Sequence, residues 1–412
     1  MCAKWNPETQ PDVVIDAISR IAYVNDEGNA AFRGVTKIEH NLAILVTTLD
    51  FHTDIPPSLQ RAFMWSAVCE AVKKGRLDAL HVKRFVSSRE REYLKRPTSR
   101  YVLLTGVSIK LPVDILRTRI TGVSLTFTRR YPARFDRTNI EPQIRNYVPG
   151  KLPNNYAWVR AGTSARSDHE AYDRGLEALD LLRAIWNFNT SFCATRMTWP
   201  TRGPVNNIVN APVHSLHRPS GALASDLFGY EPSYRKPVRP LDLTGKLDKL
   251  RAFERRLRNN LWKWKETDFL RRALVRYVRA QDDAELANVF LSLWSVLEML
   301  TDTLKLSYDR TIRRAAFMWD NRALAVQELK HLRSWRNRRV HGGESTEDKE
   351  VHVYQLKKYV DTLLGFLLFN PYNSNKNLQE IACFLDLPFD EGVLARRIEM
   401  YRQAKELRAT DK

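Results

Sequence analysis

The sequence predicts an α+β fold in which a mixed amino-terminal half precedes an all-helical bundle. Three observations predict it: strand-like alternation of apolar residues before about residue 196, a proline- and glycine-rich stretch in mid-chain, and helical periodicity in nearly every segment after residue 245. At 412 residues the chain exceeds what one hydrophobic core usually serves, so we expect more than one domain.

The first half mixes strand and helix patterns. Residues 106–111 (GVSIKL) and 122–128 (GVSLTFT) carry an apolar side chain at every second position, which predicts strands of a sheet with one solvated face. Residues 167–187 have helical periodicity instead, and Ser167 and Glu170 form a capping-box pattern at the start of that helix.

A connector is expected in the middle of the chain. Residues 196–243 are rich in proline, asparagine and glycine, so regular helix is not expected across them. We place the domain boundary there. The expected organisation is an α+β domain over residues 1–243, a helical bundle over residues 244–370 and a carboxyl-terminal helical extension over residues 371–412.

Helical segments follow one another after the connector. A long basic helix is expected from Lys246 to about Ala280. A second helix is expected to begin with Asp282 as its amino-terminal cap and Glu285, three residues later, as the partner of that cap. The further helical segments begin at Asp309, Asn321 and Glu350, and the last of them ends before Pro371. Antiparallel helices with short connections imply a bundle.

The chain is strongly basic. Lysine and arginine outnumber aspartate and glutamate by 66 to 47, which gives a formal net charge of +19. Such a surplus attracts polyanions, namely RNA, DNA or an anionic lipid surface. The charge is spread along the chain without a tail-like block, so we expect it on folded surfaces.

Cysteine usage and apolar runs indicate the compartment. The four cysteines lie too far apart for a CxxC pair, which predicts a reducing environment. The amino terminus lacks an apolar signal core. The strongest late apolar run, residues 359–369, is interrupted by Asp361 and is far shorter than the ~20 residues of a spanning helix. We expect a cytoplasmic protein without a membrane partner.

Residues 333–343, RSWRNRRVHGG, combine four arginines, Asn337 and His341 and end in two glycines. One interpretation is structural, because cations stabilise the carboxyl end of a helix and glycine takes its left-handed cap. The spacing alone does not decide, since an arginine followed by a histidine with four to six residues between them occurs three times in the chain. Only this pair stands at the end of a helix in the all-helical region.

The helical geometry of this motif suggests a second interpretation. On an ideal helix Asn337 and His341 are neighbours one turn apart, whereas Arg336 lies about 140° around the axis from His341. Either the helix ends before His341, or two copies of the motif face each other across a twofold axis. Metal-free RNA cleavage needs a base, an acid and a cation near the phosphate, and histidine and arginine suit these roles.

Read as R-N-x-x-x-H, residues 336–341 resemble the signature of the HEPN (higher eukaryotes and prokaryotes nucleotide-binding) superfamily. Residues 290–302 (FLSLWSVLEMLTD) resemble the second helix of its Apea-like branch, and residues 167–187 resemble the amino-terminal extension of those proteins. The resemblance covers roughly residues 245–370. It implies a four- or five-helix bundle whose dimer joins two motifs into a metal-independent endoribonuclease site.

The resemblance also implies roles for individual residues. Arg336 and His341 take the catalytic roles, and Asn337 is the accompanying polar residue. Glu298 is a supporting residue: it either faces water at the edge of an apolar helix or, if buried, pairs with a cation such as Arg336, and we favour the pair. The residues expected to contact RNA phosphates flank the site, namely Arg333, Arg338 and Arg339.

Function is expected to follow from the same resemblance. It implies a homodimeric bacterial ribonuclease of antiphage defence by abortive infection, with RNA as substrate, no cofactor, a phage-derived or cellular trigger, and residues 1–243 sensing or restraining. The alternative is a non-catalytic module that binds RNA or a protein and uses the motif for dimer contacts. Some HEPN toxins carry a tyrosine two residues after the histidine that a partner nucleotidyltransferase modifies; here Gly343 stands there, so that control is not implied.

Two further patterns concern a metal site and a surface for stacking on bases. His214 and His217 have a spacing that two metal ligands can use, but no other ligand residue nearby completes a set, so no metal site is predicted. The basic segment 251–280 contains interleaved aromatic residues that could stack on bases or pack in a core, and we favour packing. These aromatic residues are Trp262, Trp264, Phe269 and Tyr277.

Overall fold

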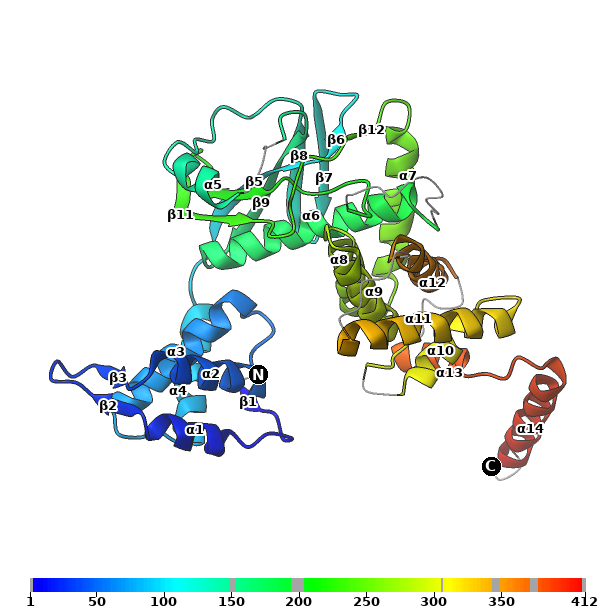
Figure 1. Ribbon diagram of the computed structural model, residues 1–412, viewed down its shortest axis with the longest axis horizontal. Helices are drawn as coiled ribbons and strands as arrows, with labels where there is room; N and C mark the ends of the chain where they lie inside the picture. The colour runs from blue at the N-terminus through cyan, green and yellow to red at the C-terminus, as the bar shows by residue number, and fades with distance from the viewer. Residues whose placement is uncertain are drawn as a thin grey trace.

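The computed structural model describes residues 3–148, 153–193, 204–304, 307–342, 349–370 and 377–409 (Figure 1). Over these residues an antiparallel sheet forms from strands between residues 99 and 230, and the elements after residue 246 are helices. The α+β class predicted from the sequence is therefore confirmed at this level. Within the described ranges, no helix has both the length and the apolar character that crossing a bilayer requires.

Residues 3–94 form a mainly helical unit with a hydrophobic core of its own. Its elements are β1 (Lys4–Trp5), α1 (Pro11–Ser19), β2 (Ala22–Val24), β3 (Ala30–Phe32), α2 (Val35–Thr48), β4 (Leu49–Asp50), α3 (Pro57–Lys73) and α4 (Ala79–Leu94). The hydroxyl of Tyr93, at the end of α4, donates a 2.7 Å hydrogen bond to Glu170. This contact joins the unit to the rest of the protein.

Six antiparallel strands form the central sheet. In spatial order they are β11 (Leu223–Tyr230), β10 (Val213–His217), β5 (Ser99–Val107), β9 (Ala157–Ala165), β8 (Val123–Thr128) and β7 (Ile115–Ile120). The strand predicted over residues 122–128 is β8. The strand predicted over residues 106–111 is divided, because β5 ends at Val107 and β6 (Ile109–Lys110) pairs instead with β12 (Leu241–Asp242).

One long helix, α6 (Asp168–Thr190), packs along one face of the sheet (Figure 1). The Ser167 hydroxyl caps it by accepting a hydrogen bond from the backbone of Glu170, as predicted. The Glu170 carboxylate does not complete the reciprocal capping box and instead accepts from Tyr93 and from the backbone of Arg166. A Cβ on Gly175 would lie 3.1 Å from Leu103 of β5, so this glycine permits the close approach of α6 to the sheet.

The predicted connector contributes to the sheet. Residues 204–243 contain no helix, as expected, but they supply β10, β11 and β12. The strand β10 (VHSLH) is buried along its whole length, so it lacks the alternation of a strand with one solvated face. Its polar side chains form hydrogen bonds inside the sheet, which explains why the sequence pattern did not indicate a strand here.

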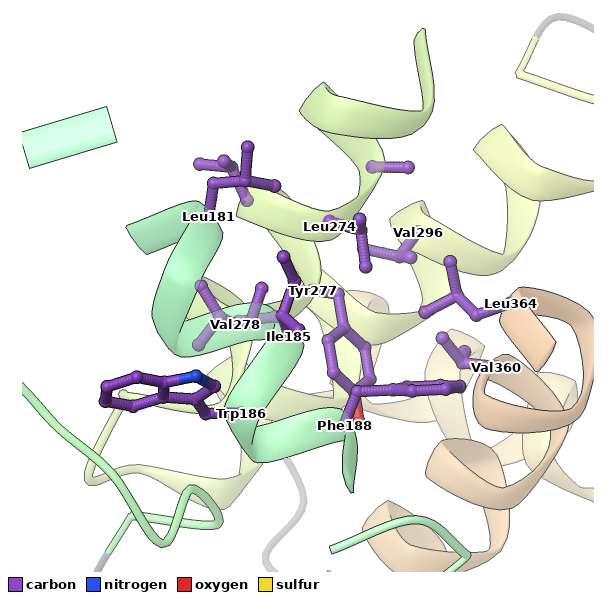
Figure 2. Packing of buried hydrophobic residues seen from close by; sticks show 14 of the residues in the cluster. Leu181, Ile185, Trp186, Phe188, Leu274, Tyr277, Val278, Val296, Val360 and Leu364 are labelled. Atoms are coloured by element: carbon purple, nitrogen blue, oxygen red, sulfur yellow. The ribbon is translucent and has the colours of Figure 1, made fainter. Parts of the chain in front are cut away.

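The second half is a bundle of helices that packs against α6. Its helices are α7 (Leu247–Trp262), α8 (Thr267–Ala280), α9 (Leu286–Leu300), α10 (Tyr308–Ala316), α11 (Arg322–Gly342) and α12 (Lys349–Phe369). Figure 2 shows side chains of α6, α8, α9 and α12 meeting in one apolar cluster. The predicted apolar face of α12 is confirmed, since Leu356, Val360, Leu363 and Leu367 are all buried.

Two expectations for the bundle were wrong. The basic helix predicted from Lys246 to Ala280 is broken between α7 and α8, where Trp264 turns into the core and its indole N–H donates to the carbonyl of Leu367 at 3.2 Å. Asp282 does not cap α9, which begins after Glu285 without a side-chain cap. The Asp282 carboxylate instead accepts hydrogen bonds of 2.8 and 3.0 Å from the buried guanidinium of Arg183 on α6.

The predicted carboxyl-terminal extension contains two helices. α13 (Leu378–Leu385) packs on the bundle, and Ile381 and Leu385 belong to its core. α14 (Glu391–Ala409) extends away from the other helices (Figure 1), and most of its described side chains are exposed.

The two main hydrophobic cores divide the chain at a different place from the predicted boundary. The first core includes residues from Ala3 to Val86. The second runs from Tyr101 of β5 to Leu385 of α13 and so crosses residue 243. The physical reason is α6, which buries one side against the sheet and the other against the bundle.

Candidate functional site

The predicted motif lies on the last turns of α11, and the helix is fixed to the bundle by a buried face. Ala325, Leu329, Leu332 and Trp335 recur at helical spacing and are each at most 3 % exposed. The Trp335 ring meets Phe290 of α9 at a centroid distance of 4.4 Å. A fully buried leucine stabilises a fold by about 1.5–3 kcal/mol, so this face holds α11 firmly.

Arg336 follows directly after this buried face and is half-buried. Its guanidinium carbon lies 4.8 Å from the centre of the Tyr308 ring, at the start of α10, in a cation–π contact. Tyr308 in turn meets the ring of Trp294 on α9 at 6.4 Å. Helices on both sides of α11 therefore restrict the arginine side chain.

Glu298 of α9 lies on the same side of the bundle as Arg336. Its carboxylate accepts a 2.9 Å hydrogen bond from the indole N–H of Trp294. Burial raises the pKa of Glu298 above its usual range, and the hydrogen bond from Trp294 and the positive charge of Arg336 oppose that rise. Among the described residues no ion pair joins the two side chains directly, so they interact over a longer distance. The direct pair that we favoured for Glu298 is therefore not observed, and the nearest partner of its carboxylate is the indole of Trp294.

The flanking arginines are placed differently from one another. Arg333 forms a 2.6 Å ion pair with Asp309 of α10. Arg338 is exposed. The side chains of Arg339 and His341 lie outside the described residues, so the meeting of His341 with Arg336 of a second copy stays a prediction.

The path of α11 removes one of the two alternatives that the motif allowed. The helix continues to Gly342, so it does not end before His341, while the alternative with two facing copies stays a prediction. On a continuous helix position 341 lies about 140° from Arg336 and about 180° from the buried Leu332. Asn337 is half-buried, and its carbonyl oxygen makes only a long contact of 3.5 Å with Arg336. A single chain therefore directs positions 336 and 341 to different sides of α11.

A histidine pair lies one turn before the motif. The Nε2 atoms of His331 on α11 and His352 on α12 are 3.0 Å apart, so one ring donates a hydrogen bond to the other. The His352 ring also packs on Trp335 at 5.2 Å. The sequence reading did not identify His352, Tyr308 or Asp309, because each meets α11 only through the tertiary packing of helices.

The two histidines considered as metal ligands and most of the interleaved aromatic residues are packed inside the protein. His214 and His217 are buried in β10; one contacts Thr105 and Glu231, and the other contacts Ser215 and the carbonyl of Gly221. Within the described ranges, no three histidine, cysteine, aspartate or glutamate side chains are grouped so as to hold a metal ion. The interleaved aromatic residues of α7 and α8 are mainly core, as favoured: Trp264 and Tyr277 are buried and Phe269 is half-buried, whereas Trp262 is 45 % exposed.

Comparison with known proteins gives no relative: no family model, no curated protein and no solved structure matches the chain. The chemistry of the site is therefore argued from its own residues. The arrangement offers a guanidinium held in a fixed position, an exposed arginine one half-turn further on, and a histidine position on another side of the same helix.

Proposed function

We propose that the protein is a metal-independent endoribonuclease of HEPN type whose active site forms between two copies of α11. The observation that carries this proposal is the position of Arg336. A cation–π contact with Tyr308 of α10 restricts its side chain, and its charge acts on Glu298 of α9 at a longer distance. The continuous helix directs position 341 to another side, so that one copy does not bring the two groups together. A twofold axis beside the end of α11 would bring Arg336 of one copy towards His341 of the other.

The proposed chemistry balances without a metal ion. One histidine removes the proton from the RNA 2′-hydroxyl, and O2′ then bonds to the adjacent phosphorus. The bond from phosphorus to O5′ breaks, and the second histidine gives O5′ a proton. Arg336 stabilises the negative charge of the phosphorane. The products are a 2′,3′-cyclic phosphate and a 5′-hydroxyl, and DNA, which lacks the 2′-hydroxyl, is not cut.

The wider role is a bacterial antiphage effector that cuts RNA after a phage-derived or cellular trigger, with residues 1–243 sensing it. The net charge of +19 supports a polyanionic substrate. Of the arginines expected to contact phosphates, Arg338 is exposed and Arg333 is half-buried. Arg333 would have to exchange its ion pair with Asp309 for an RNA phosphate.

A second function is favoured by one observation. Arg333 and Arg336 already have partners within the chain, as expected of residues that stabilise a bundle. The motif could then serve a non-catalytic module that binds RNA or a protein and uses α11 for dimer contacts.

The deciding experiment incubates the purified full-length protein with single-stranded RNA in EDTA, with and without phage extract as a source of trigger. Arg336→Ala and His341→Ala should each reduce cleavage by about 10²–10⁴-fold. His40→Ala is the control, since His40 is an exposed histidine of α2 outside the motif, and it should retain cleavage. RNA that is bound but not cut under either condition would favour the non-catalytic module.

A mixing experiment tests the shared site. Wild-type and His341→Ala proteins are combined so that mixed dimers form, in which the shared site holds one histidine in place of the two that the proposed chemistry needs. Cleavage should fall further than the wild-type fraction of the mixture alone would give. Cleavage proportional to the wild-type fraction would show that each chain works by itself.

A further inference from the structure

The face of the sheet opposite α6 is basic. Register pairing places Arg117, Thr126 and Arg160 in one row across β7, β8 and β9. In the same strands the alternate positions, including Leu125 and Ala161, face α6 and the core. Arg119 lies two residues from Arg117 and so shares its face.

No position of this face in the four strands β5, β9, β8 and β7 is acidic. In β7 and β8 the face carries Ile115, Arg117, Arg119, Ser124, Thr126 and Thr128. In β9 and β5 it carries Trp158, Arg160, Gly162, Ser164, Arg100, Val102 and Leu104. Four arginines therefore lie on one sheet surface with small hydroxyl-bearing side chains between them.

Three of the basic side chains lie close together without counter-ions. Burial and the positive charges of Arg117 and Arg134 lower the pKa of Arg160. The Nε of Arg160 is buried and has no hydrogen-bond partner. Arg129, nearby in sequence, is paired with Asp114 at 3.2 Å, but no ion pair in the described part of the chain involves Arg117, Arg134 or Arg160. Like charges held together repel one another, which an anion bound between them would relieve.

The surroundings keep this cluster in place. The loop after β8 packs on the sheet through Tyr131, whose ring meets Trp158 edge-on at 4.8 Å. Arg137 lies over both rings, at 5.5 and 5.3 Å. The nearest acidic side chain of this loop, Asp136, is exposed and accepts hydrogen bonds from Thr138. The loop therefore brings further cations and leaves the arginines of the sheet unneutralised.

We propose that this basic sheet face, defined by Arg100, Arg117, Arg119, Arg134 and Arg160, binds the phosphate backbone of a single-stranded nucleic acid. The half-buried Arg160 is the centre of this face, because the positive charges of Arg117 and Arg134 act on it and no acidic side chain of the described residues pairs with it. Thr126 and Ser124, between the arginines, supply further donors to phosphate oxygens.

The extent of the face favours a strand over a small anion. α5 (Glu141–Tyr147) and its neighbours cover the end of the sheet at β10 and β11, where Ile140, Ile144 and Val213 form a separate apolar cluster. At β7 and the start of β8 the face is open, with Arg117, Arg119 and Ser124 exposed, whereas the loop after β8 packs on Trp158 of β9. The basic residues run from this open edge to Arg160 beside the loop, a track that suits an extended polyanion.

The binding experiment uses a fluorescent 12-nucleotide oligodeoxythymidine and the full-length protein. This probe carries the phosphates but no 2′-hydroxyl, so binding is measured whether or not the proposed ribonuclease activity is correct. Arg160→Gln and Arg117→Gln should each weaken binding by about tenfold, and each should reduce the salt dependence of log K by about 0.7 per lost phosphate contact. Arg397→Gln, an exposed arginine of α14 with the same change of charge, is the control and should have little effect.

Two outcomes would overturn the proposal. Arg160→Gln and Arg117→Gln proteins that bind like Arg397→Gln would show that the probe lies elsewhere. Competition by ATP as effective as that by the oligonucleotide would show a site for small anions. Thermal unfolding excludes misfolding, since Arg117 is exposed and its replacement relieves repulsion, so the melting temperature should not fall.

Discussion

The guanidinium of Arg336 lies 4.8 Å from the centre of the Tyr308 ring, 28 positions earlier in the chain, and this contact joins α10 to α11 at the predicted site. The charge of Arg336 also acts on Glu298 of α9. Three helices therefore determine where one cation can point. Such restraint is what a group that stabilises a transition state requires, because its position must not depend on the substrate.

Replacing Tyr308 should affect cleavage through the position of Arg336. Tyr308→Leu removes the aromatic face and should lower kcat by about tenfold, since a cation–π contact is worth about 0.5–2 kcal/mol. Tyr308→Phe keeps the face and should retain most of the activity. Single-turnover cleavage of a short RNA measures both variants. Equal losses in the two would mean that the hydroxyl, and not the ring, matters.

Glu298 should make the folded protein more stable at lower pH. Burial raises its pKa above the ordinary value of 4.5, so the folded chain holds this proton at a higher pH than the unfolded chain does. The free energy of unfolding contributed by Glu298 should therefore increase as the pH falls towards 4.5 and decrease as the pH rises through the raised pKa. Urea unfolding of wild type and Glu298→Gln between pH 5 and pH 7.5 measures this. The difference between the two proteins should shift in favour of the wild type at low pH; a constant difference would contradict the assignment.

The sequence predicted the helices well where the signal is local. The buried face of α12 recurs every three or four residues, and the cap of α6 is a contact between residues three apart, so both can be read from neighbouring positions. The predicted site residues of α11 also lie on one helix. What joins them to other elements could not be read in this way, because Tyr308, Asp309 and His352 reach α11 through packing between helices.

Two errors show how tertiary contacts override local patterns. Asp282 has the position and spacing of a helix cap, yet the buried Arg183 offers its carboxylate stronger hydrogen bonds. β10 looks like part of a loop because His214, Ser215 and His217 are polar, and only the sheet supplies their partners. In both places the deciding partner lies far away in the sequence.

Asp282 and Asp283 have different partners, so replacing each should lower the free energy of unfolding by a different amount. Asp282→Ala leaves Arg183 buried with Asp180 as its remaining acidic partner, and should lower the free energy of unfolding by about 3 kcal/mol. Asp283→Ala removes hydrogen bonds to Glu285 and Asn288 at an exposed site and should cost about 1 kcal/mol. Urea denaturation followed by circular dichroism compares them. The reverse order would contradict the view that Asp282 is a main partner of the buried Arg183.

A buried ion pair on α12, Lys357 with Asp361, should stabilise the position of the carboxyl end of α6. The Lys357 ammonium donates to Asp361 and to the carbonyl of Ser191, both at 2.6 Å, and Asp361 also accepts from Tyr277 at 2.7 Å. Both side chains of the pair are at most 1 % exposed. Burial raises the pKa of Asp361, and the charge of Lys357 opposes that rise. The carboxylate therefore depends on its cation to stay ionised inside the core.

Replacing one member of this ion pair should lower the free energy of unfolding more than replacing both charged groups by neutral ones. Lys357→Met leaves Asp361 buried without a cation and should lower the free energy of unfolding by about 3–5 kcal/mol. The double variant Lys357→Met/Asp361→Asn keeps a hydrogen bond for Tyr277 and should recover most of that loss, so the two substitutions are strongly non-additive. Urea unfolding of the wild type, both single variants and the double variant measures the coupling. Additive losses would mean that the pair does not hold α6 against α12, and that Ser191 is held by other contacts.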